Sequence, residues 1–385
     1  MANLLQHIPR ILVVMDMTQK ACRDKLVGIM RYACHHGPWD IQRYTNNLYI
    51  AQLGRFKNWQ PDGIIFDGEI SWRKNVRCLM GRLPDSVVQF EIPTFRRYPI
   101  VSHDSKLIAE VAADHLLQLD LTNFAFVGSL LPTFWSQMRE EVFVARLAAA
   151  GHTCHLYAPV HPEDWGLEQR HMQAWLLALP KPCGILVAHD PYAKQVLDTC
   201  LAAGIRVPDD IAVVGVDNDT DICEGTVPTL TSVFPDFEGG GYLAAELLDS
   251  LLRDTWDGSR RITYGIRGVI QRQSSMRLKT PDRLIAAAVE YIRLNACSGI
   301  TVPDVAAYLN VSRRYAERHF RAALGHSILD EIQVRRLDRV RALLRETNQP
   351  IRQIGEDCGY DSETYLKALF KRRFGMTMRD YRKSR

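Results

Sequence analysis

Residues Val302 to Ser327 read VPDVAAYLNVSRRYAERHFRAALGHS, and residues Ile351 to Thr377 read IRQIGEDCGYDSETYLKALFKRRFGMT. Both stretches have the apolar spacing of two short helices joined by a tight turn, which is the pattern of a helix-turn-helix unit. They share a phenylalanine, a glycine and a hydroxyl residue at an offset of fifty positions, namely Phe320, Gly325 and Ser327 against Phe370, Gly375 and Thr377. Two such units with basic second helices suit two successive major-groove contacts on one face of DNA.

The second helix of each unit is expected to have a buried side and an outward side. Ser312 and Ser362 are natural N-caps, and the apolar residues that follow at i, i+4 spacing point inward: Ala316, Phe320, Leu366 and Phe370. The outward residues are candidates for DNA contact: Arg313, Arg314, Glu317, Arg318 and Arg321 in the first unit, and Glu363, Thr364, Tyr365, Lys367, Lys371 and Arg372 in the second. Arginine bridges O6 and N7 of guanine, and glutamate accepts from N4 of cytosine. The basic run 371–373 is expected to reach phosphates instead.

The helical end of the chain divides into three parts. The first helix-turn-helix unit spans about residues 301–323, and the second spans about residues 351–374. Between them, residues 328–344 have the apolar spacing of one long helix. This linker helix is expected to set the distance between the two recognition helices.

These features resemble the AraC family of transcription regulators, whose signature is two helix-turn-helix units in one compact module. The resemblance covers residues 282–383 and rests on these positions: Val305, Ala306, Leu309, Ser312, Phe320, Gly325, His326 and Ser327 in the first unit, and Ile354, Gly355, Gly359, Tyr360, Ser362, Leu366, Phe370, Lys371, Phe374, Gly375, Met376, Thr377, Tyr381 and Arg382 in the second. It implies that Arg314, Glu317 and Arg318 read bases. One departure is Ala316, where the family has leucine, and it predicts looser packing of the first unit. A single charged helix face is usually just a solvated surface, so the presence of two matching units is what favours DNA binding.

The charge of the chain is unevenly distributed. From Arg277 to the end there are 22 Lys and Arg against 13 Asp and Glu, whereas the preceding residues hold 26 against 31. A basic module on an acidic body is typical of a polyanion-binding domain attached to something else. The nine cysteines are scattered without a C-x-x-C pair, and no apolar run has the length of a membrane span. We therefore expect a cytoplasmic protein that does not enter a membrane.

Residues 10–265 alternate short apolar runs with longer amphipathic segments. Runs such as Ile11–Met15 and Ile211–Val214 are typical of strands that are buried on both faces of a parallel sheet. Segments such as Gln19–His35 have helical spacing. The number of such units predicts two α/β sheets, and hence two lobes with a ligand cleft beyond the carboxyl ends of the strands.

The expected architecture is therefore a two-lobed α/β sensor with parallel sheets, followed by an all-α domain with two helix-turn-helix units. The sensor is placed at residues 1–270 and the DNA-binding domain at 282–385. Glycine, serine, proline and arginine are frequent in residues 266–281, and within this stretch we place the linker at residues 271–281.

The sensor resembles the effector domain of LacI-type repressors, which is built like a periplasmic sugar-binding protein. The resemblance is carried by Gly184–Asp219 and Leu230–Leu252, through these pieces: His189-Asp190 at a strand end, Val207-Pro208-Asp209 before the next strand, Gly215-Val216-Asp217-Asn218 after it, and Thr231-Ser232-Val233. It covers about residues 10–270, with weaker motifs in the N-terminal lobe. The resemblance implies a fold with two lobes and a small-molecule effector between them.

A small polyol would need carboxylates to accept from its hydroxyl groups, an arginine to donate, and an aromatic face against its ring. The candidates at or near strand ends are Asp16, Asp104, Trp135, Arg139, Asp190 and Asp217. Of these, the resemblance implies Arg139 as a ligand contact. Two of them have structural alternatives, because Asp217 could brace a turn and Asp104 could be the N-cap of a helix.

Two further motifs are not expected to carry a function. His152, His155 and His161 lie in a strand and loop, where the odd spacing of the first two keeps them off a common face, so no metal site is expected. The run Gly239–Gly241 lacks the Lys-Ser/Thr of a phosphate-binding loop, so it is interpreted as a helix start packed close to a sheet. We expect no cofactor, and a sugar as the small-molecule effector.

Together the two resemblances imply a ligand-responsive, sequence-specific transcription regulator, which we expect to activate genes for catabolism of a pentose-like sugar. They imply a homodimer that binds two operator half-sites in double-stranded DNA and recruits RNA polymerase. Two alternatives stay open on the residues alone. One is a sugar- or nucleotide-acting enzyme with a helical docking module, although no catalytic motif supports it. The other is a repressor with the same architecture.

Overall fold

The computed structural model describes residues 8–44, 59–67, 84–92, 96–119, 121–130, 133–160, 163–276, 283–347 and 349–383. The chain divides into two compact units, Met1–Arg277 and Leu278–Arg385. The first unit corresponds to the expected sensor and the second to the expected DNA-binding domain, and they are called the sensor and the DNA-binding unit below. None of the described helices is long and apolar enough to cross a membrane.

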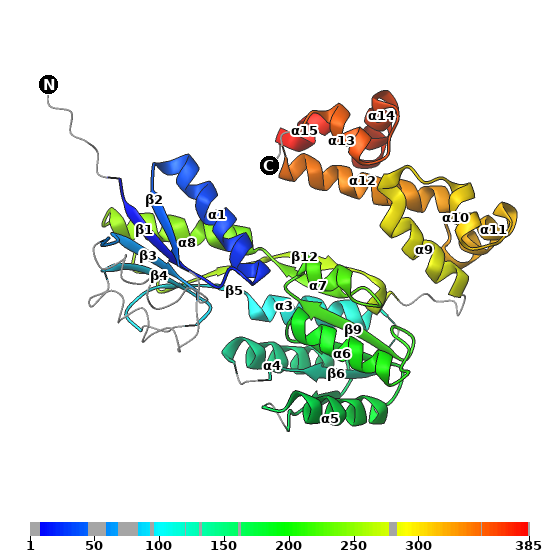
Figure 1. Ribbon diagram of the computed structural model, residues 1–385, viewed down its shortest axis with the longest axis horizontal. Coiled ribbons are helices and arrows are strands. Elements are labelled where there is room, and N and C mark those ends of the chain that lie inside the picture. Colours follow the sequence, from blue (N-terminus) through cyan, green and yellow to red (C-terminus); the bar gives the residue numbers. More distant parts are fainter. Residues whose placement is uncertain are drawn as a thin grey trace. The chain divides into compact units, whose positions relative to one another are not determined.

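The sensor contains two six-stranded sheets, each of which forms the centre of a lobe (Figure 1). Lobe 1 has the strand order β11-β5-β4-β3-β1-β2, and its described pairs are all parallel. Its elements are β1 (Arg10–Val14), α1 (Lys20–His36), β2 (Asp40–Tyr44), β3 (Gly63–Phe66), β4 (Ser86–Phe90), β5 (Ile100–His103), α8 (Phe237–Leu252) and β11 (Arg261–Tyr264). Residues 11–15 and 63–66 are buried throughout, as a parallel sheet covered by other elements requires.

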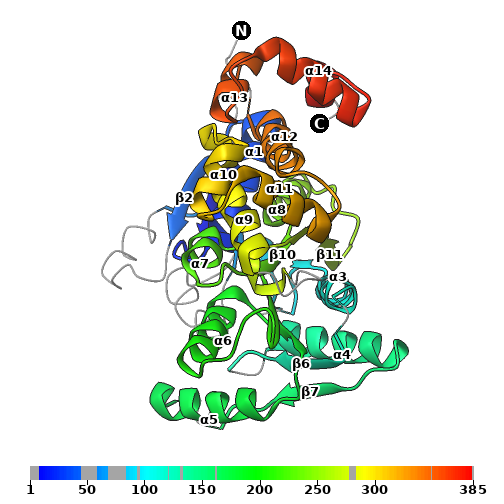
Figure 2. The same ribbon diagram turned by 90° about the vertical axis from the view of Figure 1, so that its right-hand side faces the viewer.

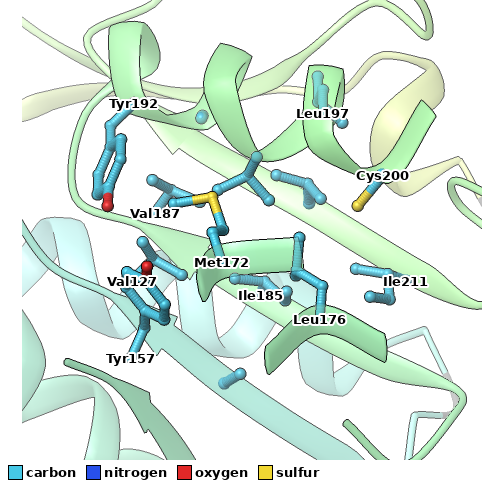
Figure 3. Packing of buried hydrophobic residues seen from close by; sticks show 14 of the residues in the cluster. Val127, Tyr157, Met172, Leu176, Ile185, Val187, Tyr192, Leu197, Cys200 and Ile211 are labelled. Atoms are coloured by element: carbon cyan, nitrogen blue, oxygen red, sulfur yellow. The ribbon is translucent and has the colours of Figure 1, made fainter. Parts of the chain in front are cut away.

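Lobe 2 has the order β12-β10-β9-β8-β6-β7, in which only β12 runs antiparallel to its neighbour among the described pairs. Its elements are α3 (Ser105–Leu117), β6 (Asn123–Val127), α4 (Phe134–Ala149), β7 (Cys154–Tyr157), α5 (Trp165–Ala178), β8 (Cys183–Val187), α6 (Asp190–Ala202), β9 (Ile211–Val216), α7 (Thr220–Gly225), β10 (Thr231–Pro235), β12 (Ile266–Ile270) and the 3-10 helix η2 (Gln273–Ser275). One apolar cluster joins this sheet to α5 and α6, with Met172 and Leu176 packed on Ile185 (Figure 3). A second joins the opposite face to α3 and α4.

The two lobes are interleaved in sequence. Within the described residues the chain passes between the sheets after β5, after β10 and after β11. The strand ends of both lobes therefore face the same region, which is where ligands bind in open α/β sheets.

The DNA-binding unit is entirely helical in its described part. Its elements are α9 (Arg283–Asn295), η3 (Ala296–Ser298), α10 (Val302–Tyr308), α11 (Arg313–Leu324), α12 (Ile328–Glu346), α13 (Ile351–Asp357), α14 (Glu363–Phe374) and α15 (Met378–Lys383). The pairs α10–α11 and α13–α14 lie near opposite ends of α12 (Figures 1 and 2). Leu337, Val340 and Leu344 of α12 are buried against α13 and α14.

The structure differs from the expectation that residues 271–281 form a linker. Arg272, Ser274 and Ser275 are buried, and the hydroxyl group of Ser274 donates to the carbonyl of Val213 at 2.6 Å. Residues 272–276 therefore pack as part of lobe 2. Residues 277–281 of the expected linker lie outside the described residues. The antiparallel strand β12 was also missed, because one arginine and one glycine interrupt its apolar pattern.

Candidate functional site

A cleft of about 750 Å³ lies between the two lobes of the sensor, within the usual size of a small-molecule site. Its walls consist mainly of residues that follow strands: Asp16, Asp67, Glu91 and His103 from lobe 1, and Ser129, His189 and Asp217 from lobe 2. Helices contribute Lys25 from α1, Arg139 from α4, and Tyr192 and Gln195 from α6. The parallel sheets thus deliver polar side chains from distant parts of the sequence to one place.

The lobe 1 wall is an ion-pair network around Lys25, which is 2% exposed. Its ammonium group lies 2.8 Å from the carboxylate of Asp67 and 3.0 Å from that of Glu91. The hydroxyl group of Tyr264 donates to Glu91 at 2.7 Å, and Nδ1 of His103 lies 2.7 Å from the same carboxylate. Because one cation faces two carboxylates, this wall carries an excess of negative charge, and its described residues offer no free cation for an anionic ligand.

The protonation states in this wall follow from burial and pairing. Burial alone would lower the pKa of Lys25, but attraction to Asp67 and Glu91 holds it well above its ordinary value. Burial alone would raise the pKa of Glu91, but His103 and Lys25 hold it well below its ordinary value. Burial, together with Arg139, lowers the pKa of His103 despite the nearby carboxylate. A neutral His103 with its proton on Nδ1 therefore suits both neighbours.

Arg139 is the centre of the lobe 2 wall and is 2% exposed. One guanidinium nitrogen donates to the carbonyl of Ala188, and another lies 3.0 Å from Nε2 of His103 in lobe 1. The guanidinium group also lies 4.9 Å from the ring centre of Trp135. Arg139 therefore links the lobes at the base of the cleft and covers part of the Trp135 ring, which leaves less of this ring for a sugar than the sequence suggested.

Asp217 lies in a turn that is held from behind by Asp190. Asp217 and Asn218 both have positive φ, at 108° and 49°, a conformation that is uncommon for residues with side chains. Asp190 is fully buried and accepts from the hydroxyl group of Ser232 at 2.7 Å and from the backbone N–H of Asp219 at 2.8 Å. Burial, opposed by Arg139 and Lys25, raises the pKa of Asp217 to about 6.

Several polar atoms in the lobe 2 wall are buried without a hydrogen-bond partner among the described residues: Oγ1 of Thr133, Nε of Arg139, Oη of Tyr192 and Oε1 of Gln195. All four residues line the cleft. The carboxylate of Asp217 lines the same cleft. Because buried polar groups nearly always have partners, this cluster of donors and acceptors fits a small ligand rich in hydroxyl groups.

The sequence-based candidates separate into two groups. Asp16, Trp135, Arg139 and Asp217 line the cleft, whereas Asp104 and Asp190 do not. Asp104 is the N-cap of α3, where it accepts from the N–H of Leu107 at 3.0 Å, and Asp190 supports the turn that carries Asp217. The sequence reasoning missed these lining residues: Lys25, Asp67, Glu91, His103, Tyr192 and Gln195. Glu91 and Asp67 directly follow strands and were detectable by that rule, but the helical residues gave no signal.

The other motifs have structural explanations. The described residues contain no cluster of three or more side chains suited to a metal ion. His155 lies in β7 and His152 lies just before it. His161 lies outside the described residues. Gly241 of the triple-glycine run packs α8 against α1, since a Cβ atom there would lie 1.9 Å from the carbonyl oxygen of Lys25.

The two helix-turn-helix units repeat one local design. Ser312 and Ser362 cap α11 and α14 by accepting from the N–H groups of Tyr315 and Tyr365, each at 3.3 Å. Both helices end at a left-handed glycine, Gly325 or Gly375. Inward residues are buried as expected: Ala316, Phe320, Leu366 and Phe370. Because the N-cap serine, the buried positions and the terminal glycine recur, the two recognition helices have the same length.

Most of the candidate DNA contacts are exposed on these helices: Arg313, Arg314, Arg318 and Arg321 on α11, and Thr364, Tyr365, Lys367, Lys371 and Arg372 on α14. Several of the candidates have partners within the protein, among them Arg318, whose guanidinium group lies 3.5 Å from Nε2 of His319. Glu363 and Lys367 form an ion pair with each other, and the hydroxyl group of Tyr365 accepts from Gln333 at 2.8 Å. Glu317 is only partly exposed, and its Oε2 atom is buried without a partner among the described residues.

Comparisons with known proteins agree with both halves of this structure. A periplasmic binding protein-like domain matches residues 113–275, and a helix-turn-helix domain matches residues 305–384. The xylose operon regulatory protein of Haemophilus influenzae is 30% identical over 352 residues, which cover 89% of this chain and 90% of the relative. The xylose operon regulatory protein of Escherichia coli K12 is 29% identical over 385 residues, which cover 97% and 96%.

A solved structure described as the xylose-binding transcription activator xylR matches with a TM-score of 0.61 and 26% identity, over 98% of this chain and 99% of that one. These relatives are transcription regulators and not enzymes, so the enzyme alternative is not supported. The matches span both the sensor and the DNA-binding unit. The chain therefore belongs to the family of xylose operon regulatory proteins, helix-turn-helix transcription regulators that carry a periplasmic-binding-protein-like sensor domain.

Proposed function

We propose that this protein is a transcription activator whose DNA binding is controlled by a pentose, D-xylose or a close stereoisomer, in the sensor cleft. The observation that carries the proposal is the cluster of unpartnered polar atoms on one wall of that cleft, in a chain that also holds a duplicated DNA-binding unit. The names of the relatives support xylose as the effector. The negative excess of the lobe 1 wall favours a neutral sugar over a sugar phosphate.

The cleft supplies each kind of contact that a sugar needs. Asp217 accepts from ligand hydroxyl groups, and Nε of Arg139 donates to a ring or hydroxyl oxygen. Tyr192, Gln195 and Thr133 complete the polar set on the same wall, while Asp16 approaches from lobe 1. Phe237 and the uncovered part of Trp135 provide apolar surface for the carbon face of the ring.

Binding at this place would favour a closed arrangement of the lobes, because the ligand would contact both walls at once. To move a two-state equilibrium from 1:99 to 99:1, a ligand needs about 5.5 kcal/mol of differential affinity. Several buried hydrogen bonds of about 1 kcal/mol each, some of them to charged groups, supply an energy of this size. The closed sensor would then favour one presentation of the DNA-binding unit.

On the DNA side, we infer that α11 and α14 enter successive major grooves. Arg314, Glu317 and Arg318 would read bases, and Lys371 and Arg372 would contact phosphates. A homodimer would present two such duplicated units to two operator half-sites and recruit RNA polymerase in the cytoplasm. Activation is proposed over repression because the matched xylR structure is described as an activator.

The proposal is tested by isothermal titration of the full-length protein with D-xylose, L-arabinose, D-ribose and D-glucose. We expect D-xylose to bind most tightly and Asp217→Ala to weaken its binding at least roughly tenfold, because a charge-assisted hydrogen bond contributes about 1.5–3 kcal/mol. Asp104→Ala is the matched control, because this carboxylate caps a helix and does not line the cleft. If Asp217→Ala leaves the dissociation constant unchanged, the ligand does not occupy this site.

A further inference from the structure

The DNA-binding unit contains two cysteines that are far apart in sequence and adjacent in space. Cys297 lies in η3, before the first helix-turn-helix unit, and Cys358 is the C-cap of α13 in the second. Cys297 packs against the apolar cluster that contains Cys358. The two thiols are close enough that each shifts the pKa of the other.

The backbones that carry the two thiols also approach closely. A Cβ atom at Gly359, the residue after Cys358, would lie only 2.9 Å from the carbonyl oxygen of Cys297 and 3.1 Å from the nitrogen of Gly299. Gly359 has a φ of 76°, so the turn that leads to the recognition helix α14 is tight here. The backbones of the two segments are therefore in close contact.

Arg336 of α12 holds both segments in place. Its guanidinium group donates to the carbonyls of Ala296 at 2.7 Å and Ile300 at 2.9 Å, on either side of Cys297. The same group lies 5.6 Å from the ring centre of Tyr360, two residues after Cys358. Arg336 thus fixes the approach of the thiols and places a positive charge near them.

The two sulfurs differ in reactivity. Cys297 is half-buried and Cys358 is buried. Interaction with the Cys358 thiol and the charges of Arg339 and Arg336 outweigh burial and lower the pKa of Cys297 to about 7, so a large fraction of it is thiolate at neutral pH. Interaction with Cys297 and burial raise the pKa of Cys358. An accessible thiolate beside a protonated partner is the arrangement of a redox-sensitive pair.

We propose that Cys297 and Cys358 are a redox modification site, which a hydroperoxide converts to an intramolecular disulfide that weakens DNA binding. The Cys297 thiolate attacks the O–O bond of hydrogen peroxide, takes up one oxygen as sulfenic acid, and water leaves after one proton is added. The Cys358 thiol then attacks that sulfur, forms the S–S bond and releases a second water. Two thiols lose two electrons to one peroxide, and a dithiol reductant reverses the reaction.

The consequence for DNA binding follows from the position of the bond. A disulfide requires the sulfurs to move from contact to about 2.05 Å, and the tight packing at Gly359 leaves the turn no space to do this without a backbone shift. The shifted turn leads directly to α14, while η3 leads to the first unit. The bond would therefore change the relative presentation of the two recognition helices, which must fit adjacent grooves together.

The test uses the full-length protein and a DNA duplex selected from a random pool by the reduced protein. After treatment with hydrogen peroxide, peptide mapping under non-reducing conditions should show the Cys297–Cys358 cross-link. Fluorescence anisotropy should show at least roughly tenfold weaker binding of the duplex, the size expected for one misplaced base contact, and a dithiol should restore it. Cys297→Ser should retain its affinity under the same oxidation, whereas Cys34→Ser, which removes an exposed thiol on α1, should behave like the wild type.

Absence of the cross-linked peptide, or a cross-link without loss of affinity, overturns the proposal. An equal loss in Cys297→Ser overturns it as well, because the damage then lies elsewhere. The measurement of DNA affinity rests on the proposed function, but failure of the proposed function and failure of the redox proposal give different results. If the reduced protein selects no sequence from the pool, the proposed function fails and so does redox control of DNA binding, while a cross-link in the peptide map still identifies the modification site.

Discussion

Tyr192 and Tyr157 illustrate the difference between a buried hydroxyl group that lacks a partner and one that is paired within the protein. Its side chain is 1% exposed, yet its hydroxyl group has no partner among the described residues. Tyr157 lies in the same apolar cluster (Figure 3), but its hydroxyl group donates to Glu168 and lies 3.1 Å from Nδ1 of His171. An unpaired buried hydroxyl group destabilises the ligand-free protein, whereas a paired one does not.

We predict opposite effects for Tyr192→Phe and Tyr157→Phe. The first should leave the ligand-free melting temperature unchanged or raise it, and should weaken D-xylose binding by about 1 kcal/mol. The second should destabilise the ligand-free protein by about 1–3 kcal/mol and leave the sugar affinity unchanged, because buried Glu168 loses one of its hydrogen bonds. Calorimetry of both variants measures stability and affinity together. A lower ligand-free stability in Tyr192→Phe would show that its hydroxyl group is already satisfied.

Asp217 should make sugar binding dependent on pH. Its pKa is raised to about 6 by burial, so it gains a proton as the pH falls through this value and then accepts fewer hydrogen bonds. Sugar affinity should therefore fall between neutral pH and about pH 5. The ligand-free protein should show the opposite sign: because the folded pKa lies above the ordinary value of 3.8, stability from this group falls as the pH rises from about 4 to 6. Asp217→Asn should remove both dependences in titrations across this range, and a pH profile identical to that of the wild type would contradict the role of Asp217.

Arg318 and Arg372 should differ in what they contribute to DNA recognition. Arg318 lies at the exposed centre of α11 and Arg372 lies in the last turn of α14. We expect Arg318→Ala to cost about 1–3 kcal/mol and to relax preference at one base pair, and Arg372→Ala to weaken all duplexes equally. Binding to a set of single-base operator variants distinguishes these outcomes. Uniform weakening by Arg318→Ala would assign this residue to a phosphate.

At the scale of elements, the contact between helices α1 and α8 determines the position of a side chain in the cleft. A Cβ atom at Gly28 would lie 1.9 Å from the carbonyl oxygen of Glu238, and one at Gly241 would lie 1.9 Å from that of Lys25. The two glycines thus allow the helix backbones to touch. The same contact positions Lys25, whose side chain organises the lobe 1 wall of the cleft.

We predict that Gly241→Ala destabilises the sensor by about 1–3 kcal/mol, since an added methyl group in a packed contact forces the backbone to move. Displacement of Lys25 should also weaken sugar binding. Gly225→Ala is the matched control, because no atom lies within 4 Å of a Cβ placed at that helical glycine. Denaturant unfolding of both variants measures the difference. Equal stability of the two would mean that the helices are not in contact.

Elements with a strong local signal were predictable from the sequence. The apolar runs of β1 and β9 and the serine caps of α11 and α14 were all located, because their neighbours in sequence determine them. The short strands β2 and β11 were missed, since they are half-exposed and carry polar residues. The cleft was predictable at strand ends, but Tyr192 and Gln195 come from a helix whose rotation depends on the packed core.

At the scale of the whole molecule, the chain joins an acidic sensor to a basic DNA-binding unit. The C-terminal residues from Arg277 carry nine more positive than negative formal charges, and the remainder carries five more negative ones. This separation confines strong attraction for DNA to one unit and should make binding steeply dependent on salt. For a sugar to control DNA binding, the sensor and the DNA-binding unit must take part in one conformational equilibrium. The sugar and the DNA then shift the population between the same states.

The most direct measurement of this shared equilibrium is a reciprocal binding experiment with the wild-type protein at fixed salt and pH. The dissociation constant for the selected duplex is measured with and without saturating D-xylose, and that for D-xylose with and without saturating duplex. We expect both constants to fall by the same factor, at least roughly fivefold, and Asp217→Ala to abolish the effect while retaining sugar-free DNA binding. Tight binding of D-xylose that leaves the affinity for DNA unchanged would contradict a ligand-gated regulator.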